Sequence, residues 1–110
     1  MEFYYSATAD DLRQYFFYNP RTGAVIGQPS RPWGLGTSTR GAGERMGEVA
    51  PSGRFISWTT PGGGRARILR CDWVAWTLYY GTPPCGPLIH INGDMLDDRI
   101  SNLREPADFM

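Results

Sequence analysis

Apolar residues in this chain occur in short runs that alternate with segments rich in Gly, Pro and polar residues. Thr8, with Asp11 three positions later, is typical of a helix start, because a side-chain hydroxyl there caps a free backbone N–H. The helix that follows presents three apolar or aromatic residues on one face: Leu12, Tyr15 and Phe16. Residues 19–23, Asn-Pro-Arg-Thr-Gly, then predict a turn, and residues 24–26 predict a short strand.

The middle of the chain predicts a β-hairpin and a second helix. Residues 54–59 and 65–70 are the two strand candidates, on either side of a Pro-Gly-Gly-Gly segment. Asp72 is positioned to cap a helix over residues 73–80, which Gly81 ends. Four residues of this helix form one stripe, which we expect to belong to the core: Trp73, Trp76, Thr77 and Tyr80.

The last third predicts a strand over residues 88–91 and a tight turn at Asn92-Gly93. His90, the single histidine of the chain, precedes this turn, and five acidic or amide residues follow it: Asn92, Asp94, Asp97, Asp98 and Asn102. An imidazole beside carboxylates is typical of a general base, and a group of carboxylates is typical of a divalent-cation site. The alternative is that these Asn, Gly and Asp residues serve turn geometry alone.

The composition indicates one globular domain over residues 1–110. Hydrophobic residues make up 41% of the chain, and 14 Gly with 9 Pro predict many turns around a small core. No apolar run approaches the roughly 20 residues that span a bilayer, and we expect no secretory signal. The two cysteines, Cys71 and Cys85, are expected to be reduced thiols in a reducing compartment.

The formal net charge of zero is a cancellation between regions, and every basic residue is Arg. Residues 21–70 contain eight Arg and two Glu, whereas both ends of the chain are net acidic. Because Arg binds phosphate in a bidentate manner, this middle region is a candidate surface for DNA or an acidic protein. Within it, residues 27–47 predict a mobile, basic, Gly- and Pro-rich loop, the alternative being a solvated loop that keeps the chain in solution. The candidate binding residues are Arg31, Arg40, Arg45, Arg54, Arg65, Arg67 and Arg70.

The order of residues in the last third strongly resembles the motif of the HNH endonucleases, the phage-type homing and free-standing nucleases. Residues 90–94 read His-Ile-Asn-Gly-Asp, and residues 97–104 continue as Asp-Asp-Arg-Ile-Ser-Asn-Leu-Arg. Upstream, residues 18–23 resemble the Tyr-Asp-Pro-x-Thr-Gly opening of these proteins. Residues 74–83 resemble their Leu-Ala-Trp helix with its Tyr-Gly and Pro exit. The resemblance therefore covers most of the chain and is weakest over residues 27–47.

This resemblance implies a ββα-metal fold in which the first His, here His90, is the general base that activates water. It also implies that Asn102 fixes the loop between the two strands. A divalent ion such as Mg²⁺ then neutralises charge on the scissile phosphate. We therefore expect an α+β fold, a small HNH-like domain with an N-terminal helix, a β-hairpin, a Trp-rich helix and a truncated ββα motif over residues 86–110.

The sequence departs from the family pattern at the metal site. Ile89 precedes His90 at a position where the family often has a carboxylate ligand, and the third signature residue is expected near position 111, just beyond Met110. Asp98 replaces the Asn of the Asp-Asn-Arg segment, and Asp72 stands where the family often has a His. Four carboxylates are candidate substitute ligands: Asp94, Asp97, Asp98 and Asp108. A general base without a Lewis acid is a poor nuclease, because phosphodiester cleavage needs charge neutralisation.

Three functions remain open at this point. The first is a catalytically impaired phage or prophage protein that binds DNA or a host bacterial protein, as an inhibitor in host takeover or anti-defence. The second is an active Mg²⁺-dependent DNA nicking endonuclease with His90 as general base. The third is a packaging accessory that works beside the terminase. All three imply the cytoplasm of a bacterial host cell and no membrane partner, and a homodimer is expected to cover Phe109 and Met110 at the C-terminal hairpin.

Overall fold

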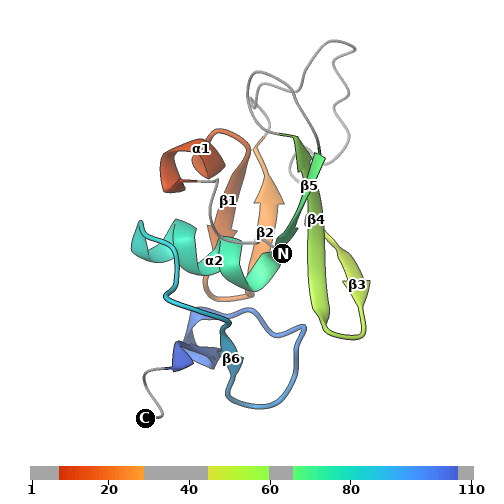
Figure 1. Ribbon diagram of the computed structural model, residues 1–110, viewed down its shortest axis with the longest axis vertical. Coiled ribbons are helices and arrows are strands. Elements are labelled where there is room, and N and C mark those ends of the chain that lie inside the picture. Colours follow the sequence, from red (N-terminus) through yellow and green to blue (C-terminus); the bar gives the residue numbers. More distant parts are fainter. Residues whose placement is uncertain (1–7, 29–44, 60–65, 107–110) are drawn as a thin grey trace.

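The computed structural model describes residues 8–28, 45–59 and 66–106, and within them the chain has an α+β fold (Figure 1). The prediction of this fold class is confirmed at that level. Helices and strands follow one another in this order: α1 (Ala9–Arg13), β1 (Phe16–Asn19), β2 (Ala24–Gly27), β3 (Glu48–Ala50), β4 (Gly53–Thr59), β5 (Ala66–Arg70), α2 (Cys71–Tyr80), β6 (Ile89–His90), the 3₁₀ helix η1 (Ile100–Asn102) and β7 (Leu103–Arg104).

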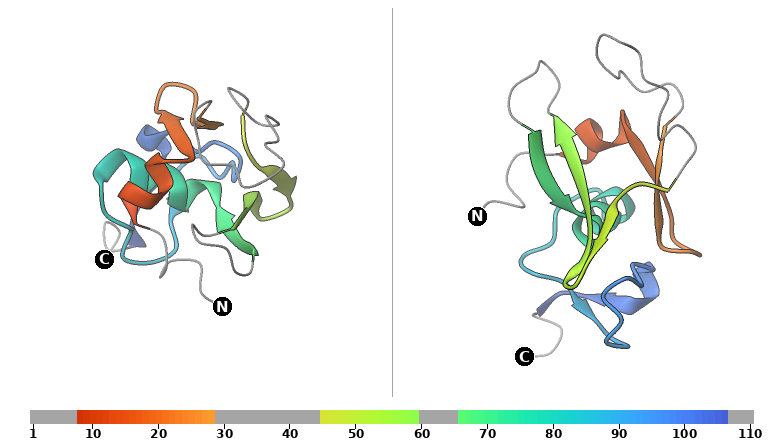
Figure 2. Two further views of the ribbon diagram at one scale, coloured as in Figure 1. Left: turned by 90° about the horizontal axis from the view of Figure 1, so that it is seen from above. Right: turned by 90° about the vertical axis from the view of Figure 1, so that its right-hand side faces the viewer.

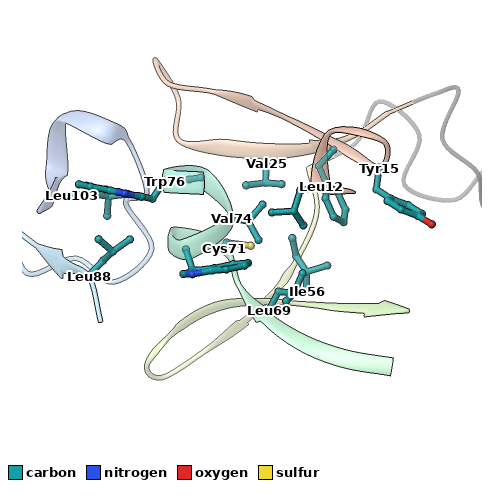
Figure 3. Packing of buried hydrophobic residues seen from close by; sticks show 13 residues of the cluster. Leu12, Tyr15, Val25, Ile56, Leu69, Cys71, Val74, Trp76, Leu88 and Leu103 are labelled. Carbon is teal, nitrogen blue, oxygen red and sulfur yellow. The ribbon is translucent and has the colours of Figure 1, made fainter. Parts of the chain in front are cut away.

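The strands form three separate antiparallel sheets, β1–β2, β3–β4–β5 and β6–β7. Helix α2 lies between the first two sheets, which is clearest in the right-hand view of Figure 2, where α2 is seen nearly end-on. The β6–β7 ribbon lies below α2 in the view of Figure 1, on the other side of this helix from α1. Figure 3 shows the resulting core: Val74 and Cys71 of α2 lie between Leu12 and Val25 on one side and Ile56 and Leu69 on the other.

The N-terminal helix begins as predicted and ends earlier than expected. The Thr8 hydroxyl accepts a hydrogen bond from the backbone N–H of Asp11 at 3.1 Å, which confirms the cap. The helix ends at Arg13, so Phe16 belongs to β1 and not to a helical face, although its side chain is buried. Strand β1 was not predicted, because its pairing with β2 decides its conformation more than its own sequence does.

The turn after β1 brings the chain close to the C-terminal part of the molecule. Gly23 has a φ of +81°, in the left-handed region that favours glycine. A Cβ at this position would lie 2.7 Å from the backbone N of Arg99 and 2.9 Å from the carbonyl carbon of Asp98. The predicted turn therefore has a second role, because it is where the first hairpin packs against the loop that carries Asp98.

The predicted hairpin is confirmed by β4 and β5, whose register pairs Ser57 with Ile68. Residues 60–65, and the side chains of Trp58, Thr59, Ala66 and Arg67, lie outside the described part of the chain. Strand β3, which pairs with β4, was not predicted. Most of the expected loop over 27–47 also lies outside the described residues, but its two ends are anchored, since Gly27 belongs to β2 and Arg45 forms an isolated bridge with Ile26.

Helix α2 differs from the prediction at its start. It begins at Cys71, its N-cap residue is Arg70, and Asp72 lies inside the first turn instead of capping it. The predicted end is correct, because Gly81 adopts a φ of +84° and donates its N–H to the Thr77 carbonyl at 2.9 Å. Three members of the predicted stripe are buried, but Tyr80 is 54% exposed. Within the described residues, no helix is long and apolar enough to cross a membrane.

The C-terminal ribbon is shorter than predicted. The strand expected over residues 88–91 comprises only Ile89 and His90, which pair with Arg104 and Leu103. The turn at Asn92-Gly93 is confirmed, with Gly93 at a φ of +79°. Cys71 is buried, Cys85 is exposed, and no disulfide joins these two described residues. Asp108, Phe109 and Met110 lie outside the described residues, so the predicted dimer contact stays a prediction.

Candidate functional site

Three buried polar side chains converge where α2, the β6–β7 ribbon and the loop before η1 meet. They are Asp72, His90 and Asp98, which we call the buried triad, and one ligand atom from each lies within 4.8 Å of the others. His90 Nε2 lies 2.8 Å from Asp98 Oδ1 and 3.9 Å from Asp72 Oδ2. The side chain of His90 has no exposed surface, and those of Asp72 and Asp98 are 4% and 1% exposed.

The position of His90 follows from the alternation of side chains along a strand. Ile89 and Ile91 on either side of it are 37% and 52% exposed, so His90 points inward from β6. Its Nε2 is hydrogen-bonded to Asp98 Oδ1, and its Nδ1 is buried with no hydrogen-bond partner among the described residues. The imidazole is therefore enclosed by the protein instead of facing a surface.

Arg70 balances the charge of Asp72. Its Nε lies 3.2 Å from Asp72 Oδ1 and its second terminal nitrogen 3.0 Å from Asp72 Oδ2, while that nitrogen also donates to the Ser52 carbonyl at 2.9 Å. The same guanidinium lies over the Phe55 ring, 5.1 Å from its centroid. Since carboxylate oxygens carry two lone pairs each, Asp72 still has acceptor capacity on the side that faces His90.

The Asp98 carboxylate contacts no arginine among the described residues, and its close partner is His90. Burial raises the pKa of its carboxyl, the hydrogen bond with His90 opposes that rise, and the negative charge of Asp72 adds to it. Its Oδ2 accepts no hydrogen bond from the described residues. The backbone at this position is held by β1, because the Tyr18 hydroxyl donates to the Asp98 carbonyl at 2.6 Å. Burial raises the pKa of this Tyr18 hydroxyl as well.

A second polar group, which we call the loop cluster, organises the loop of the ribbon. Its members are Asn92, Asp94, Asp97, Arg99 and Asn102. Asn102 Nδ2 donates to Asn92 Oδ1 and to the Asp97 carbonyl, both at 2.9 Å, and Asn102 Oδ1 accepts the Asn92 backbone N–H at 3.0 Å. Asn102 therefore joins the start of the loop to its middle, as the resemblance implied for this residue.

Two further predicted metal ligands, Asp94 and Asp97, belong to the loop cluster and not to the buried triad, and the fourth, Asp108, lies outside the described residues. Asp94 is exposed, and its Oδ1 accepts the Leu96 backbone N–H at 3.0 Å. Asp97 pairs with Arg99 through contacts of 2.6 and 2.7 Å. The hydrogen bonds from Arg99 hold the pKa of Asp97 at about 2. The structure therefore brings Asp98 to His90, while Asp94 and Asp97 complete hydrogen bonds of the loop.

The predicted binding arginines fall into three groups. Arg45 is exposed. Arg54 and Arg70 are partly buried and have internal partners, since one terminal nitrogen of Arg54 donates to the Gly47 carbonyl at 3.2 Å and Arg70 pairs with Asp72. Arg31, Arg40 and Arg65 lie outside the described residues, as does the side chain of Arg67. Of the predicted binding arginines whose side chains the structure describes, Arg45 is the exposed one.

Asp72 is the site residue that the sequence analysis did not assign to the site. Two features of the sequence could have pointed to Asp72 as a site residue. It is a carboxylate within a helix whose neighbours Cys71, Trp73 and Val74 are apolar, and it stands where the resembled family often has a His. The cap predicted for Asp72 gave its carboxylate a partner in its own backbone, because a cap side chain bonds the nearby N–H groups. Asp72 was therefore not predicted to contact a distant site.

The chemical capacity of the site follows from this arrangement. The residue next to His90 on the exposed face of β6 is Ile89, which offers no ligand, so the residues present do not fit the Mg²⁺ ion that the resemblance implied beside the first His. The buried triad could hold a metal ion through a different set of ligands, Asp72, His90 and Asp98. A scan of family models and searches of curated proteins and of solved structures found no match to this chain.

Proposed function

We propose that this chain is an HNH-like domain that binds DNA without cleaving it. The observation that carries the proposal is the burial of His90, whose side chain has no exposed surface and whose Nε2 contacts Asp98 at 2.8 Å. A general base has to contact the water that attacks the phosphodiester, directly or through one further water. An imidazole enclosed between α2 and the loop before η1 has no such access.

The exposed face of β6 supports the same proposal. Ile89 and Ile91 present alkyl groups on either side of His90, and neither can bind a cation. Cleavage of a phosphodiester depends on a Lewis acid placed at the reacting phosphate. A surface with two isoleucines lacks both the base and the metal ligand on the side where DNA would have to lie.

DNA is the partner that the charge distribution favours over a protein. Residues 21–70 carry eight Arg against two Glu, and Arg suits bidentate contacts with phosphate. Arg54 and Arg70 stabilise the fold through internal contacts, so the contacts to DNA fall to the remaining arginines of that region. These are Arg21, Arg31, Arg40, Arg45, Arg65 and Arg67.

Cleavage is tested with supercoiled plasmid incubated with the protein and Mg²⁺, Mn²⁺ or Zn²⁺ in turn. We expect no nicking with any of the three ions. Nicking by the wild-type protein that is lost in His90→Ala would contradict the proposal and establish an active nickase with His90 as its base. The comparison with His90→Ala is needed because a contaminating nuclease would nick equally in both preparations.

Binding is tested by the salt dependence of duplex affinity. Each phosphate contact contributes about −0.9 to the slope of log K against log salt concentration, so the double change Arg65→Ala with Arg67→Ala is expected to reduce the slope by about 2. Arg13→Ala is the matched control, since Arg13 is exposed, lies in the acidic N-terminal region and pairs with Asp10. A flat salt dependence, or no binding, would contradict a DNA partner, and capture of a host protein by the immobilised chain would then identify the other class of target.

A further inference from the structure

We infer that the buried triad is a binding site for a divalent cation of the Zn²⁺ type, which ties α2 to the β6–β7 ribbon. This site is independent of the proposed DNA binding. It differs from the metal position that the HNH resemblance implied, because it uses His90 itself and two carboxylates that the fold brings from α2 and from the loop before η1.

The distances within the buried triad fit such an ion. Around a tetrahedral Zn²⁺, with ligands at about 2.0–2.2 Å, neighbouring ligand atoms lie about 3.3 Å apart. His90 Nε2 lies 2.8 Å from Asp98 Oδ1 and 3.9 Å from Asp72 Oδ2, so the measured separations bracket that value. An ion fits between the three ligand atoms when Asp98 Oδ1 moves slightly away from His90 Nε2 and Asp72 Oδ2 moves slightly toward it.

The hydrogen bonding of the buried triad also indicates a missing partner. Asp98 is 1% exposed, and its Oδ2 accepts no hydrogen bond from the described residues. A buried carboxylate oxygen left without a partner is costly, and native proteins nearly always provide one. A cation bound by Asp98 satisfies that oxygen or its neighbour and replaces the hydrogen bond that now joins Asp98 to His90.

Charge provides the third argument. Two carboxylates lie in this buried region, and Arg70 neutralises Asp72 through direct contacts at 3.0–3.3 Å. The charge of Arg45 favours the ionised form of Asp98, but the Arg45 side chain is exposed, and Asp98 Oδ2 accepts no hydrogen bond from it or from any other described residue. A dication at the buried triad neutralises Asp98 directly, while Arg70 remains as the outer partner that orients Asp72.

The donor atoms select the kind of ion. One imidazole nitrogen with two carboxylate oxygens suits Zn²⁺ and its neighbours among the first-row transition metals, whereas Mg²⁺ prefers oxygen ligands and keeps several waters. A fully buried site has little room for such waters. An ion that takes the lone pair of His90 Nε2 requires the neutral tautomer with its single hydrogen on Nδ1. The hydrogen between Nε2 and Asp98 therefore moves to Nδ1 if the imidazole is neutral, and is released to solvent if the imidazole carries a hydrogen on both nitrogens.

The first experiment is a thermal-shift and calorimetric titration of the chelator-treated protein with Zn²⁺ and, separately, with Mg²⁺. We expect one Zn²⁺ per chain, and a rise in Tm on the order of 10 °C when free Zn²⁺ is 100 times its Kd. Mg²⁺ is expected to give no rise at the same concentration. The absence of stoichiometric Zn²⁺ binding, or an equal response to Mg²⁺, would overturn the assignment.

The second experiment compares variants of matched chemistry. Asp98→Asn removes one ligand charge within the buried triad and is expected to weaken Zn²⁺ binding by about 100-fold or more. Asp94→Asn makes the same change at an exposed position of the same loop and is expected to retain wild-type affinity. Cys85→Ser removes an exposed thiol, a group to which zinc can bind adventitiously, and is also expected to retain wild-type affinity. Equal affinity in Asp98→Asn and Asp94→Asn, or loss in Cys85→Ser, would overturn the site.

A spectroscopic measurement keeps the test decisive if Asp98→Asn does not fold. Co²⁺ added to the wild-type protein and to Asp94→Asn is expected to give an intense visible d–d absorption, which indicates a low-coordinate site with a nitrogen ligand, and Zn²⁺ is expected to abolish it. A weak spectrum typical of hydrated Co²⁺ in the folded wild-type protein would rule the site out.

Discussion

The buried triad and the loop cluster lie close together on the β6–β7 ribbon, yet they hold the molecule together in different ways. In the loop cluster, the side chains other than that of the buried Asn102 are exposed or partly exposed, and they bond to groups of their own loop, with Asn102 reaching back to Asn92 and Asp97. In the buried triad, side chains from α2, β6 and the loop before η1 meet in the interior, and Asp98 Oδ2 accepts no hydrogen bond from the described residues. The loop cluster therefore completes a turn, whereas the buried triad concentrates charge that an outside ion can neutralise.

Removal of His90 is the change with the largest expected effect on this comparison. His90→Ala removes the hydrogen-bond partner of Asp98 and leaves that buried carboxylate uncompensated beside the second one of Asp72, which costs about 3–5 kcal/mol. Urea unfolding measured without metal gives the free energy of unfolding. Ile91→Ala, at the next position in the chain but outside β6 and 52% exposed, is the control and is expected to change that free energy by less than about 0.5 kcal/mol. Similar losses in the two variants would mean that the buried triad stabilises nothing.

Gly23 tests whether the first hairpin positions the buried triad. Gly23→Ala places a Cβ at a φ of +81° and within 2.9 Å of the Asp98–Arg99 backbone, so we expect a loss of about 1–3 kcal/mol. Gly93→Ala is the matched control, because its φ is +79° but a Cβ there meets no atom within 4 Å. A larger loss at Gly23 than at Gly93 measures the packing contact separately from the backbone strain, and equal losses would show that the contact has no effect.

Asn102 is the residue on which the loop cluster depends. Asn102→Ala removes three hydrogen bonds, leaving the Asn92 backbone N–H without an acceptor and the Asp97 carbonyl without a donor among the described residues, which we expect to cost about 2 kcal/mol. A double-mutant cycle with Asn92→Ala is expected to give a coupling energy of about 1 kcal/mol. Purely additive effects would show that the two amides act independently and that the loop is held by its backbone alone.

The smallest effect is expected at the surface of the loop cluster. Asp97→Asn weakens the ion pair with Arg99, whose side chain is 47% exposed, so the expected loss is about 0.2–1 kcal/mol and diminishes as salt is added. Thermal unfolding at low and high salt provides the measurement. A loss as large as that of His90→Ala would abolish the distinction between the two clusters.

Several elements could be predicted because their determinants are local. The Thr8 cap, the turn at residues 19–23, the end of α2 at Gly81 and the turn at Asn92-Gly93 each depend on a few neighbouring residues. Strands β1 and β3 were not predicted, because their extended conformation depends on pairing, of β1 with β2 and of β3 with β4. The start of α2 was predicted two residues late, since Asp72 has the chemistry of a cap but its carboxylate binds Arg70.

The sequence by itself determined which groups the site has available: one histidine, an acidic C-terminal third and a run of Asn and Asp typical of turns. The tertiary structure alone decided which carboxylates reach that histidine. Asp98 is positioned through a hydrogen bond to Tyr18, 80 residues away, and Asp72 arrives on a helix that packs against the ribbon. Strand alternation turns His90 toward them, and burial then makes their charges matter, because water no longer screens or solvates them.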